Sequence, residues 1–227
     1  MKLLIISDTH FPKPYSMLYR QVIQRERPDH VVFLGDNIQA DPSQNILELH
    51  KRFIREFSGL HKRSKTAYII GDNDFKKNTG ICEYVSNQNF MNTDPFVFKI
   101  GNMEFFHGNV EKYLSNGNGT FNRFIEDAGF RILRMTGPIG KHALPALISN
   151  MTRLVHNTDS QTYLFLGHIH LLKRSSHNIF CGTLSSKRLL YGPNDSIGYV
   201  TVRHSNFIVS SPSAITIHHL SMPRLHP

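Results

Sequence analysis

The sequence predicts an α/β fold in which two packed sheets carry helices on their outer faces. In the first half of the 227-residue chain, short runs that are apolar throughout alternate with helical patterns. Such runs are typical of strands buried on both faces. Toward the C-terminus, strand-like segments alternate apolar and polar residues, which is typical of antiparallel pairing. Strands of both kinds, with helical segments between them, indicate two sheets packed together with helices outside.

The first half of the chain contains three expected strands and two expected helices. Apolar runs that end in polar residues predict strands at residues 3–6, 31–34 and 67–70. A fourth run of this kind, further along the chain, predicts a strand at 163–166. A helix is expected over 15–26, ahead of Pro28, because proline cannot continue a helix. A second, amphipathic helix is expected where apolar residues recur every three or four positions, at Ile46, Leu49, Phe53, Phe57 and Leu60.

The remaining segments predict a hairpin, a helical insertion and further strands. Alternating residues on either side of Gly101-Asn102 predict a hairpin over 94–107. Residues 109–160 carry two apolar helical faces separated by Gly137-Pro138, and we interpret them as a helical cap inserted into one domain, 1–220. Later strands are expected at 179–184, 197–202, 207–210 and 214–220, before a frayed tail at 221–227.

Composition excludes some classes of protein. A hydrophobic fraction of 40% supplies a sizeable core and excludes wholesale disorder. No apolar run approaches the ~20 residues that span a bilayer, and the N-terminal run is too short for a signal peptide, so a cytoplasmic protein is expected. Cys82 and Cys181 lack metal-type spacing and are expected to be free thiols. A net charge of +9 favours anionic partners, whether phosphate esters, nucleic acid or acidic membrane.

Carboxylates and imidazoles directly follow the predicted strands. The residues in question are Asp8, His10, Asp36, Asp72, His107, His168 and His170. Each motif alone is common as a turn or a helix cap, but five in order, each after a short apolar strand, are not. Strand ends of an open sheet meet at one edge, where an uncompensated cluster of these groups would be costly. Divalent transition metals bind this ligand set and remove that cost.

This ordered set of motifs resembles the calcineurin-like metallophosphoesterase superfamily. The family blocks are Asp-x-His, Gly-Asp, Gly-Asn-His-Asp/Glu, His and Gly-His-x-His. The corresponding blocks here are Asp8-Thr9-His10, Gly35-Asp36-Asn37, Gly71-Asp72-Asn73-Asp74, His107-Gly108 and Gly167-His168-Ile169-His170. The resemblance implies a four-layer αββα sandwich of two mixed sheets, with two metals at one sheet edge.

The resemblance also implies which residues bind each metal. One metal would be held by Asp8, His10, Asp36 and His170. The other would be held by Asp36, Asp72, His107 and His168, so that Asp36 bridges the pair. Two divalent transition-metal ions are therefore expected, with manganese the first choice and iron, nickel or zinc as alternatives. A hydroxide bridging such a pair would attack phosphorus in line with the leaving group.

The third block departs from the family pattern. Asp72 and Asn73 stand where the family usually has a ligating Asn and a His that helps the leaving group depart. We expect Asn73 to be the catalytic residue at this position, although its amide can donate a hydrogen bond but not a proton. Leaving groups that need no protonation, such as an aryl alcohol or phosphate, would then be preferred. Asp72 adds a negative charge, which predicts a weaker Lewis acid or one trivalent iron. Asn37 and Asn109 are the candidates for substrate contact.

The predicted function is hydrolysis of phosphate esters or anhydrides by a binuclear metal centre, because every metal position keeps a competent ligand. The substrate would be a phosphorylated small molecule or a nucleotide-linked one. One alternative is a scaffold of this fold with little or no activity. Another is a nuclease that binds nucleic acid through the basic stretch 51–65, although the charges of this stretch are also typical of the solvent-exposed face of a helix. The cap resembles that of UDP-diacylglucosamine hydrolases, so residues 141–156 could contact a membrane, but packing on the body is favoured.

Overall fold

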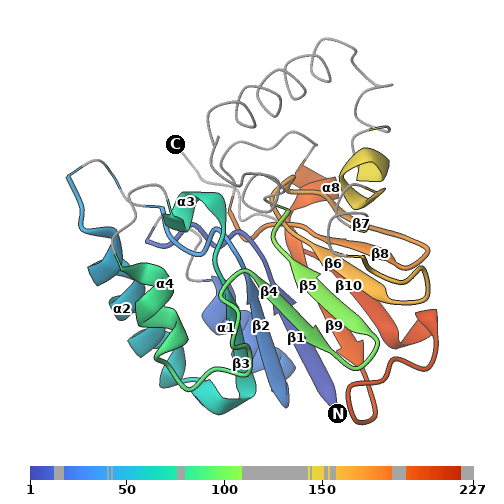
Figure 1. The fold of residues 1–227 in the computed structure, drawn as a ribbon, viewed down its shortest axis with the longest axis horizontal. Helices are drawn as coiled ribbons and strands as arrows, with labels where there is room; N and C mark the ends of the chain where they lie inside the picture. The colour runs from blue at the N-terminus through green and yellow to red at the C-terminus, as the bar shows by residue number, and fades with distance from the viewer. Residues whose placement is uncertain are drawn as a thin grey trace.

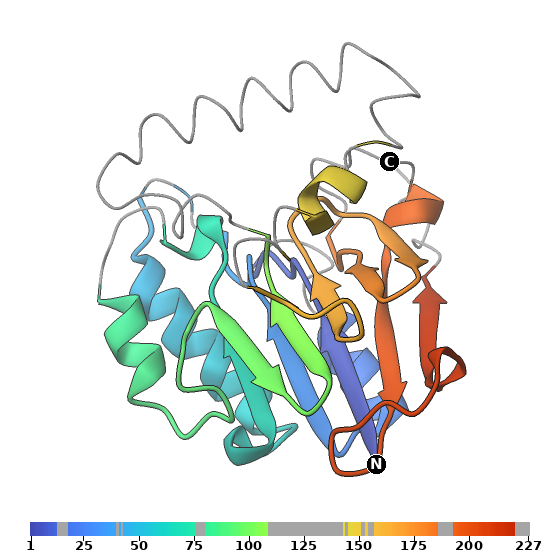
Figure 2. The same ribbon diagram turned by 45° about the vertical axis from the view of Figure 1, so that its right-hand side comes forward.

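The computed structural model describes residues 1–12, 18–39, 41, 43–75, 80–108, 143, 145–150, 153, 157–185 and 193–220. In these residues two five-stranded sheets pack face to face (Figures 1 and 2). The first sheet has the order β10-β9-β1-β2-β3, and the second β4-β5-β6-β8-β7. The strands of the first are β1 Lys2–Ile6, β2 His30–Leu34, β3 Thr66–Ile69, β9 Gly198–Arg203 and β10 Ile215–His219. Those of the second are β4 Val97–Ile100, β5 Met103–Phe106, β6 Tyr163–Leu166, β7 Leu172–Ser175 and β8 Asn178–Cys181.

Both sheets are mixed. Strand β1 pairs in parallel with β2, and β2 with β3. The pairs β1–β9 and β9–β10 are antiparallel. In the second sheet β5, β6 and β8 are parallel, and β4 and β7 are antiparallel edge strands. The parallel strands of each sheet therefore end together, and the segments that follow them share one edge of the sandwich.

Helices cover the outer face of the first sheet (Figure 1). The helices of the described residues are α1 Leu18–Glu26, α2 Ile46–Ser58, α3 Asp72–Phe75, α4 Ile81–Ser86 and α8 Pro193–Ser196, with short 3-10 turns at Arg63–Lys65 and Pro212–Ala214. The Asn45 side chain caps α2 by accepting the N–H groups of Leu47 and Glu48, which explains why this helix begins at Ile46. Its apolar face, including Phe53 and Phe57, packs on the sheet.

Alternating burial along the strands produces the layers. In β1, Leu3 and Ile5 lie between the sheets, whereas Leu4 and Ile6 face the helices. On the far side of the second sheet, Ile148 of the helical residues 145–150 packs against an apolar cluster of strand residues. The predicted αββα order, with two mixed sheets between helices, is confirmed.

The structure corrects the sequence-based prediction after residue 170. Residues 207–210 are not a strand, because Asn206 and Phe207 have φ values of 47° and 62° and form a turn closed by an isolated bridge between Ser205 and Ile208. Strand β7 was not predicted, and earlier in the chain helix α4 was not predicted either. Most of the expected cap, 109–160, and the tail 221–227 lie outside the described residues. Within the described residues, no helix has both the length and the hydropathy needed to cross a bilayer.

Candidate metal centre

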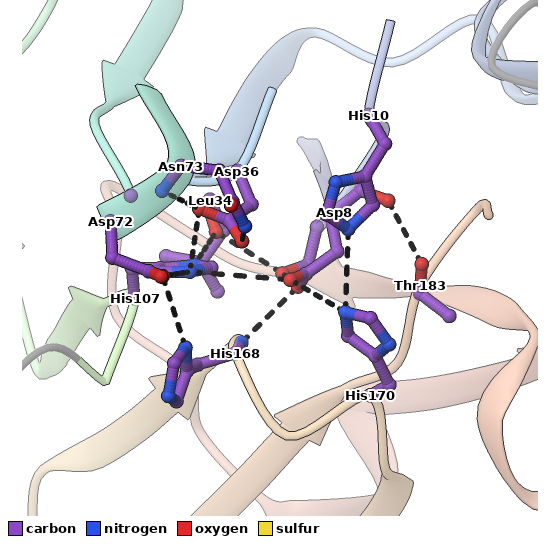
Figure 3. Close-up of polar contacts among 12 residues, drawn as sticks. Asp8, His10, Leu34, Asp36, Asp72, Asn73, His107, His168, His170 and Thr183 are labelled. Atoms are coloured by element: carbon purple, nitrogen blue, oxygen red, sulfur yellow. Dashed lines mark hydrogen bonds and ion pairs between the residues drawn. The ribbon is translucent and has the colours of Figure 1, made fainter. Parts of the chain in front are cut away.

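All seven predicted ligands meet at the edge where the parallel strands end (Figure 3). Asp8 and His10 follow β1, and Asp36 follows β2. Asp72 begins α3 after β3, His107 follows β5, and His168 and His170 follow β6. The site therefore takes ligands from both sheets.

Asp8, His10 and His170 form one group of possible metal ligands. The His170 Nε2 atom lies 3.1 Å from Asp8 Oδ1 and 3.4 Å from His10 Nε2. All three residues are buried. This half of the site is enclosed by protein.

Asp72, His107 and His168 form a second group. The Asp72 Oδ1 atom lies 3.2 Å from His168 Nδ1 and 3.5 Å from His107 Nε2. His107 Nε2 also lies 3.3 Å from Asp36 Oδ1 and 4.0 Å from Asp8 Oδ1. Asp8, Asp36 and His107 form a third group, which links the other two through Asp8 and His107. The Asp72 side chain is 38% exposed and that of His168 15%, so solvent reaches this half of the site.

The chemistry of the donor set fits metal ions. Three ligand atoms, Asp8 Oδ1, Asp72 Oδ1 and His107 Nε2, are buried without a hydrogen-bond partner. Burial alone would raise the pKa of Asp8, but the charges of His107 and His170 lower it to about 2. Burial would lower the pKa of His107, but the Asp36 and Asp8 carboxylates raise it well above its usual value. Ions bound among these atoms would complete their coordination and replace imidazolium as the positive charge.

A left-handed backbone conformation orients most of the candidate ligands. Five of the seven candidate ligands have φ between 46° and 67°: Asp8, His10, Asp36, His168 and His170. Backbone hydrogen bonds hold these loops, from Asp8 N to Gly35 O at 3.1 Å and from His10 N to Asp36 O at 3.0 Å. Gly35 itself has φ of 73°, and a Cβ there would lie 2.3 Å from the His107 ring. The glycine of the second block therefore makes room for a ligand from the other sheet.

The residue pattern of calcineurin-like phosphoesterases matches residues 1–195. The chain belongs to this family. Among curated protein sequences, none matches the chain significantly.

Solved structures with some likeness to this phosphoesterase include YfcE, a phosphoesterase from E. coli, with 14% identity, a TM-score of 0.48 and coverage of 97% of this chain and 100% of that one. A metallophosphoesterase from Sphaerobacter thermophilus has 12% identity and a TM-score of 0.48, covering 98% and 90%. Vacuolar Protein Sorting 29 from Cryptosporidium parvum has 17% identity and a TM-score of 0.42, covering 88% and 82%. At these values the likenesses add nothing to the family assignment.

Residues behind the ligands orient them in this phosphoesterase. His107 Nδ1 lies 2.8 Å from the Leu34 carbonyl, to which it donates its proton, so Nε2 is the nitrogen that faces the site and that a metal would bind in place of a proton. Asp8 Oδ2 accepts the backbone N–H of His168 at 3.2 Å, and Thr183 Oγ1 donates to the Asp8 carbonyl at 2.8 Å. Thr183 was not predicted, because it is a lone threonine in a strand-like segment with no motif around it.

The three asparagines predicted to act in catalysis or substrate binding have different places. Asn73 donates its backbone N–H to Asp36 Oδ1 at 2.9 Å, and its side-chain amide donates to Asp36 Oδ2. Asn37 is fully buried and donates its side-chain amide to the Ile69 carbonyl at 2.7 Å, so that amide already has a partner within the protein. Asn109 lies outside the described residues. Asn73 therefore contacts the predicted bridging carboxylate.

Proposed function

We propose that this phosphoesterase is a metal-dependent hydrolase of phosphate esters or anhydrides that binds two divalent transition-metal ions. The observation that carries the proposal is a pair of possible ligand groups linked by a third, Asp8, Asp36 and His107, with buried candidate ligand atoms that lack hydrogen-bond partners. When bound, two such ions hold a phosphoryl oxygen and activate a water for attack on phosphorus. The expected ligands are those of the sequence analysis, with Asp36 between the two ions.

The difference in burial between the two groups suggests where the substrate enters. Asp8, His10 and His170 are enclosed, whereas Asp72 and His168 are open to solvent. We infer that the phosphoryl group approaches over Asp72 and His168. A chain with a net charge of +9 favours an anionic substrate in this position.

Asp72 influences which metals suit the site. Because it is a carboxylate where the family usually has an amide, the site carries three carboxylates, Asp8, Asp36 and Asp72. Carboxylate and imidazole ligands together suit manganese first, with iron, nickel or zinc as alternatives. The additional negative charge lowers the Lewis acidity of the pair, and one trivalent iron would compensate for it.

Contacts in the described residues bear on the other classes of partner. On the basic stretch, Lys51 lies 2.6 Å from Glu48 and Arg52 lies 3.0 Å from Glu56, so both cations have acidic neighbours on their own helix. In the segment proposed to contact membrane, Arg153 donates hydrogen bonds to Asn178 Oδ1 and the Asp159 carbonyl, at 2.9 and 2.7 Å. These contacts favour a phosphorylated small molecule or nucleotide-linked substrate over nucleic acid or lipid.

The experiment that tests this function is a matrix of substrates and metals. Metal-free protein is supplied with manganese, iron, nickel or zinc and assayed on aryl and alkyl phosphomonoesters, phosphodiesters and nucleotide pyrophosphates. We expect turnover that requires metal and is highest with manganese. Aryl esters and pyrophosphates should be preferred, because Asn73 cannot protonate a poor leaving group. A protein that binds no metal, or binds it without hydrolysing any substrate, would instead be a scaffold.

A further inference from the structure

Asp74 is a buried carboxylate behind the metal centre. It is fully buried and belongs to none of the possible metal-ligand groups in the described part of the chain. Its Oδ2 atom accepts the backbone N–H of Gly71 at 2.9 Å and that of Asn37 at 3.1 Å. Its Oδ1 atom accepts the backbone N–H of Ile38 at 2.7 Å. Three backbone N–H groups therefore share this one side chain, which makes it an attachment point for the segments that carry them.

The three donors belong to two separate ligand loops. Asn37 and Ile38 directly follow Asp36, whereas Gly71 directly precedes Asp72. The single atom Asp74 Oδ2 therefore joins the loop of one predicted ligand to the loop of another. The loops also touch directly, since a Cβ on Gly71 would lie 2.2 Å from the Asp36 nitrogen.

Asp74 also lies next to a helix and a strand of the first sheet. The His50 Nε2 atom of α2 lies 3.6 Å from Asp74 Oδ1, and His50 Nδ1 lies 2.8 Å from the Tyr68 hydroxyl on β3. His50 and Tyr68 are fully buried and belong to regular elements of the fold. The Asp74 side chain therefore lies between regular elements of the fold and the two ligand loops to which it is hydrogen-bonded.

We propose that Asp74 is a positioning residue that sets the separation of Asp36 and Asp72, and with it the spacing of the two metal positions. This inference rests on the proposed function, because it assumes that both carboxylates bind metal. The role depends on where the Oδ2 acceptor lies. Moving that acceptor should separate the two ligand loops even if a carboxyl group is kept.

Two substitutions distinguish the position of the acceptor from the identity of the group. Asp74→Asn replaces the carboxyl group but can keep an oxygen at the place of Oδ2, where it accepts from both loops. Asp74→Glu keeps a carboxyl group but adds a methylene and displaces the acceptor. Asn92→Ala is the matched control, because Asn92 is a buried side chain that makes hydrogen bonds to the backbone N–H and carbonyl of Tyr68, 2.8 and 3.0 Å, away from the ligand loops.

The measurement is Mn²⁺ binding to metal-free protein, with electron paramagnetic resonance to detect the exchange-coupled signal of a Mn²⁺ pair. We expect wild type, Asp74→Asn and Asn92→Ala to bind two ions and give the coupled signal. In folded Asp74→Glu, the affinity for the second ion should fall by about 10–100-fold, as for other outer partners of metal ligands, and isolated Mn²⁺ should replace the pair. Circular dichroism checks folding, and if the glutamate variant does not fold, Asp74→Ser takes its place because it also removes the bridge.

Asp74 is not a positioning residue if Asp74→Asn loses the coupled pair, or if Asp74→Glu (or its serine substitute) keeps it with wild-type affinity. Either result would overturn the inference while leaving the proposed function intact. A wild-type protein that binds no coupled pair would contradict the binuclear site itself, and the role of Asp74 would fall with it.

Discussion

Asp36 is the carboxylate that we expect to bind both metals. Its Oδ1 atom lies 3.3 Å from His107 Nε2, and both of its oxygens accept hydrogen bonds from Asn73. Asp36→Asn replaces one acceptor by a donor and removes the charge shared by both metal positions. We expect bound metal to fall from two ions to one or none, and hydrolysis of an aryl phosphate to fall by more than the ~10–100-fold typical of outer residues. Metal analysis and steady-state kinetics measure both.

The control for this variant is Asp94→Asn, at an exposed aspartate whose carboxylate accepts the N–H of Phe96 at the start of the hairpin. It should keep two ions and wild-type turnover. Two ions and near-normal turnover in Asp36→Asn would show that Asp36 does not bridge the metals.

Asn73 can be tested for two different roles. Because its side chain donates to Asp36, Asn73→Ala should weaken metal binding by about 10–100-fold. At saturating metal, the ratio of rates on aryl and alkyl phosphates should stay as in wild type. A residue that assists the leaving group would instead be needed most by alkyl esters, and its loss would raise that ratio. Asn89→Ala, at an exposed asparagine, is the matched control.

Local signals were sufficient to predict that the seven candidate ligands come together, but not which residues lie behind them. Asp8 and Asp36, for example, follow four-residue apolar runs, and parallel strands bring such ends together whatever the details of the packing. Thr183 and Asp74 act through hydrogen bonds to residues that the fold brings near, 2.8 Å in the case of Thr183. No spacing in the sequence encodes such contacts, and the contact of Asn73 with Asp36 also depends on the folded loops.

Strand β10 provides a test at the scale of an element. His218 stacks on Tyr199 of β9 at 4.5 Å, and its Nε2 lies 2.8 Å from Thr201 Oγ1, while the neighbouring His219 is exposed. Replacing both histidines by alanine should therefore lower the melting temperature by a few degrees, through lost packing worth about 1 kcal/mol. Metal content and turnover should not change.

His219→Ala alone serves as the reference, because it keeps the contacts of His218 with Tyr199 and Thr201. A folded double variant without activity would mean that the site extends to β10.

Strands buried on both faces were easier to predict than edge strands. The run Tyr163–Leu166 is apolar throughout because its two faces contact different cores, so its pattern is unambiguous. Strand β7, Leu172–Ser175, has three exposed residues out of four and therefore looks like a loop. Residues 207–210 look like a strand, but Phe207 is apolar because it packs on the rings of His30 and His204 within a turn.

At the scale of the whole molecule, His50 should make stability depend on pH. Burial lowers its pKa to about 3, whereas in the unfolded chain it titrates near the usual value of 6.5. Between these values the unfolded chain binds the additional proton, so the free energy of unfolding falls as pH falls below 6.5, by up to about 1.4 kcal/mol per pH unit. The contribution is complete above pH 6.5. Urea unfolding of metal-free protein at pH 7 and pH 5 measures it.

His50→Gln removes this proton and should make the loss between pH 7 and pH 5 smaller by about 2 kcal/mol. His219→Gln, at an exposed position, should keep the wild-type dependence. Equal pH dependence in His50→Gln and wild type would mean that His50 does not control it.

Metal binding should stabilise the whole fold, because the ligands come from both sheets. An ion present at 100 times its dissociation constant adds about 2.7 kcal/mol to the free energy of unfolding. For a chain of this size the melting temperature should rise by roughly 5–10 °C on adding manganese to metal-free protein. Chelation should reverse the rise, and Asp36→Asn should show little of it. No change on metal addition would mean that the native state does not bind the ion selectively.

The left-handed backbone of the ligand loops implies that activity and stability are opposed at the same positions. His10, His168 and His170 have φ of 49°, 67° and 52°, and this conformation costs an L-residue roughly 1–2 kcal/mol that glycine avoids. Selection for thermal tolerance alone would therefore drive each of these positions toward glycine and remove a ligand at every step. A library of such variants, ranked by heat resistance without metal, would be enriched in inactive proteins that melt later than the parent.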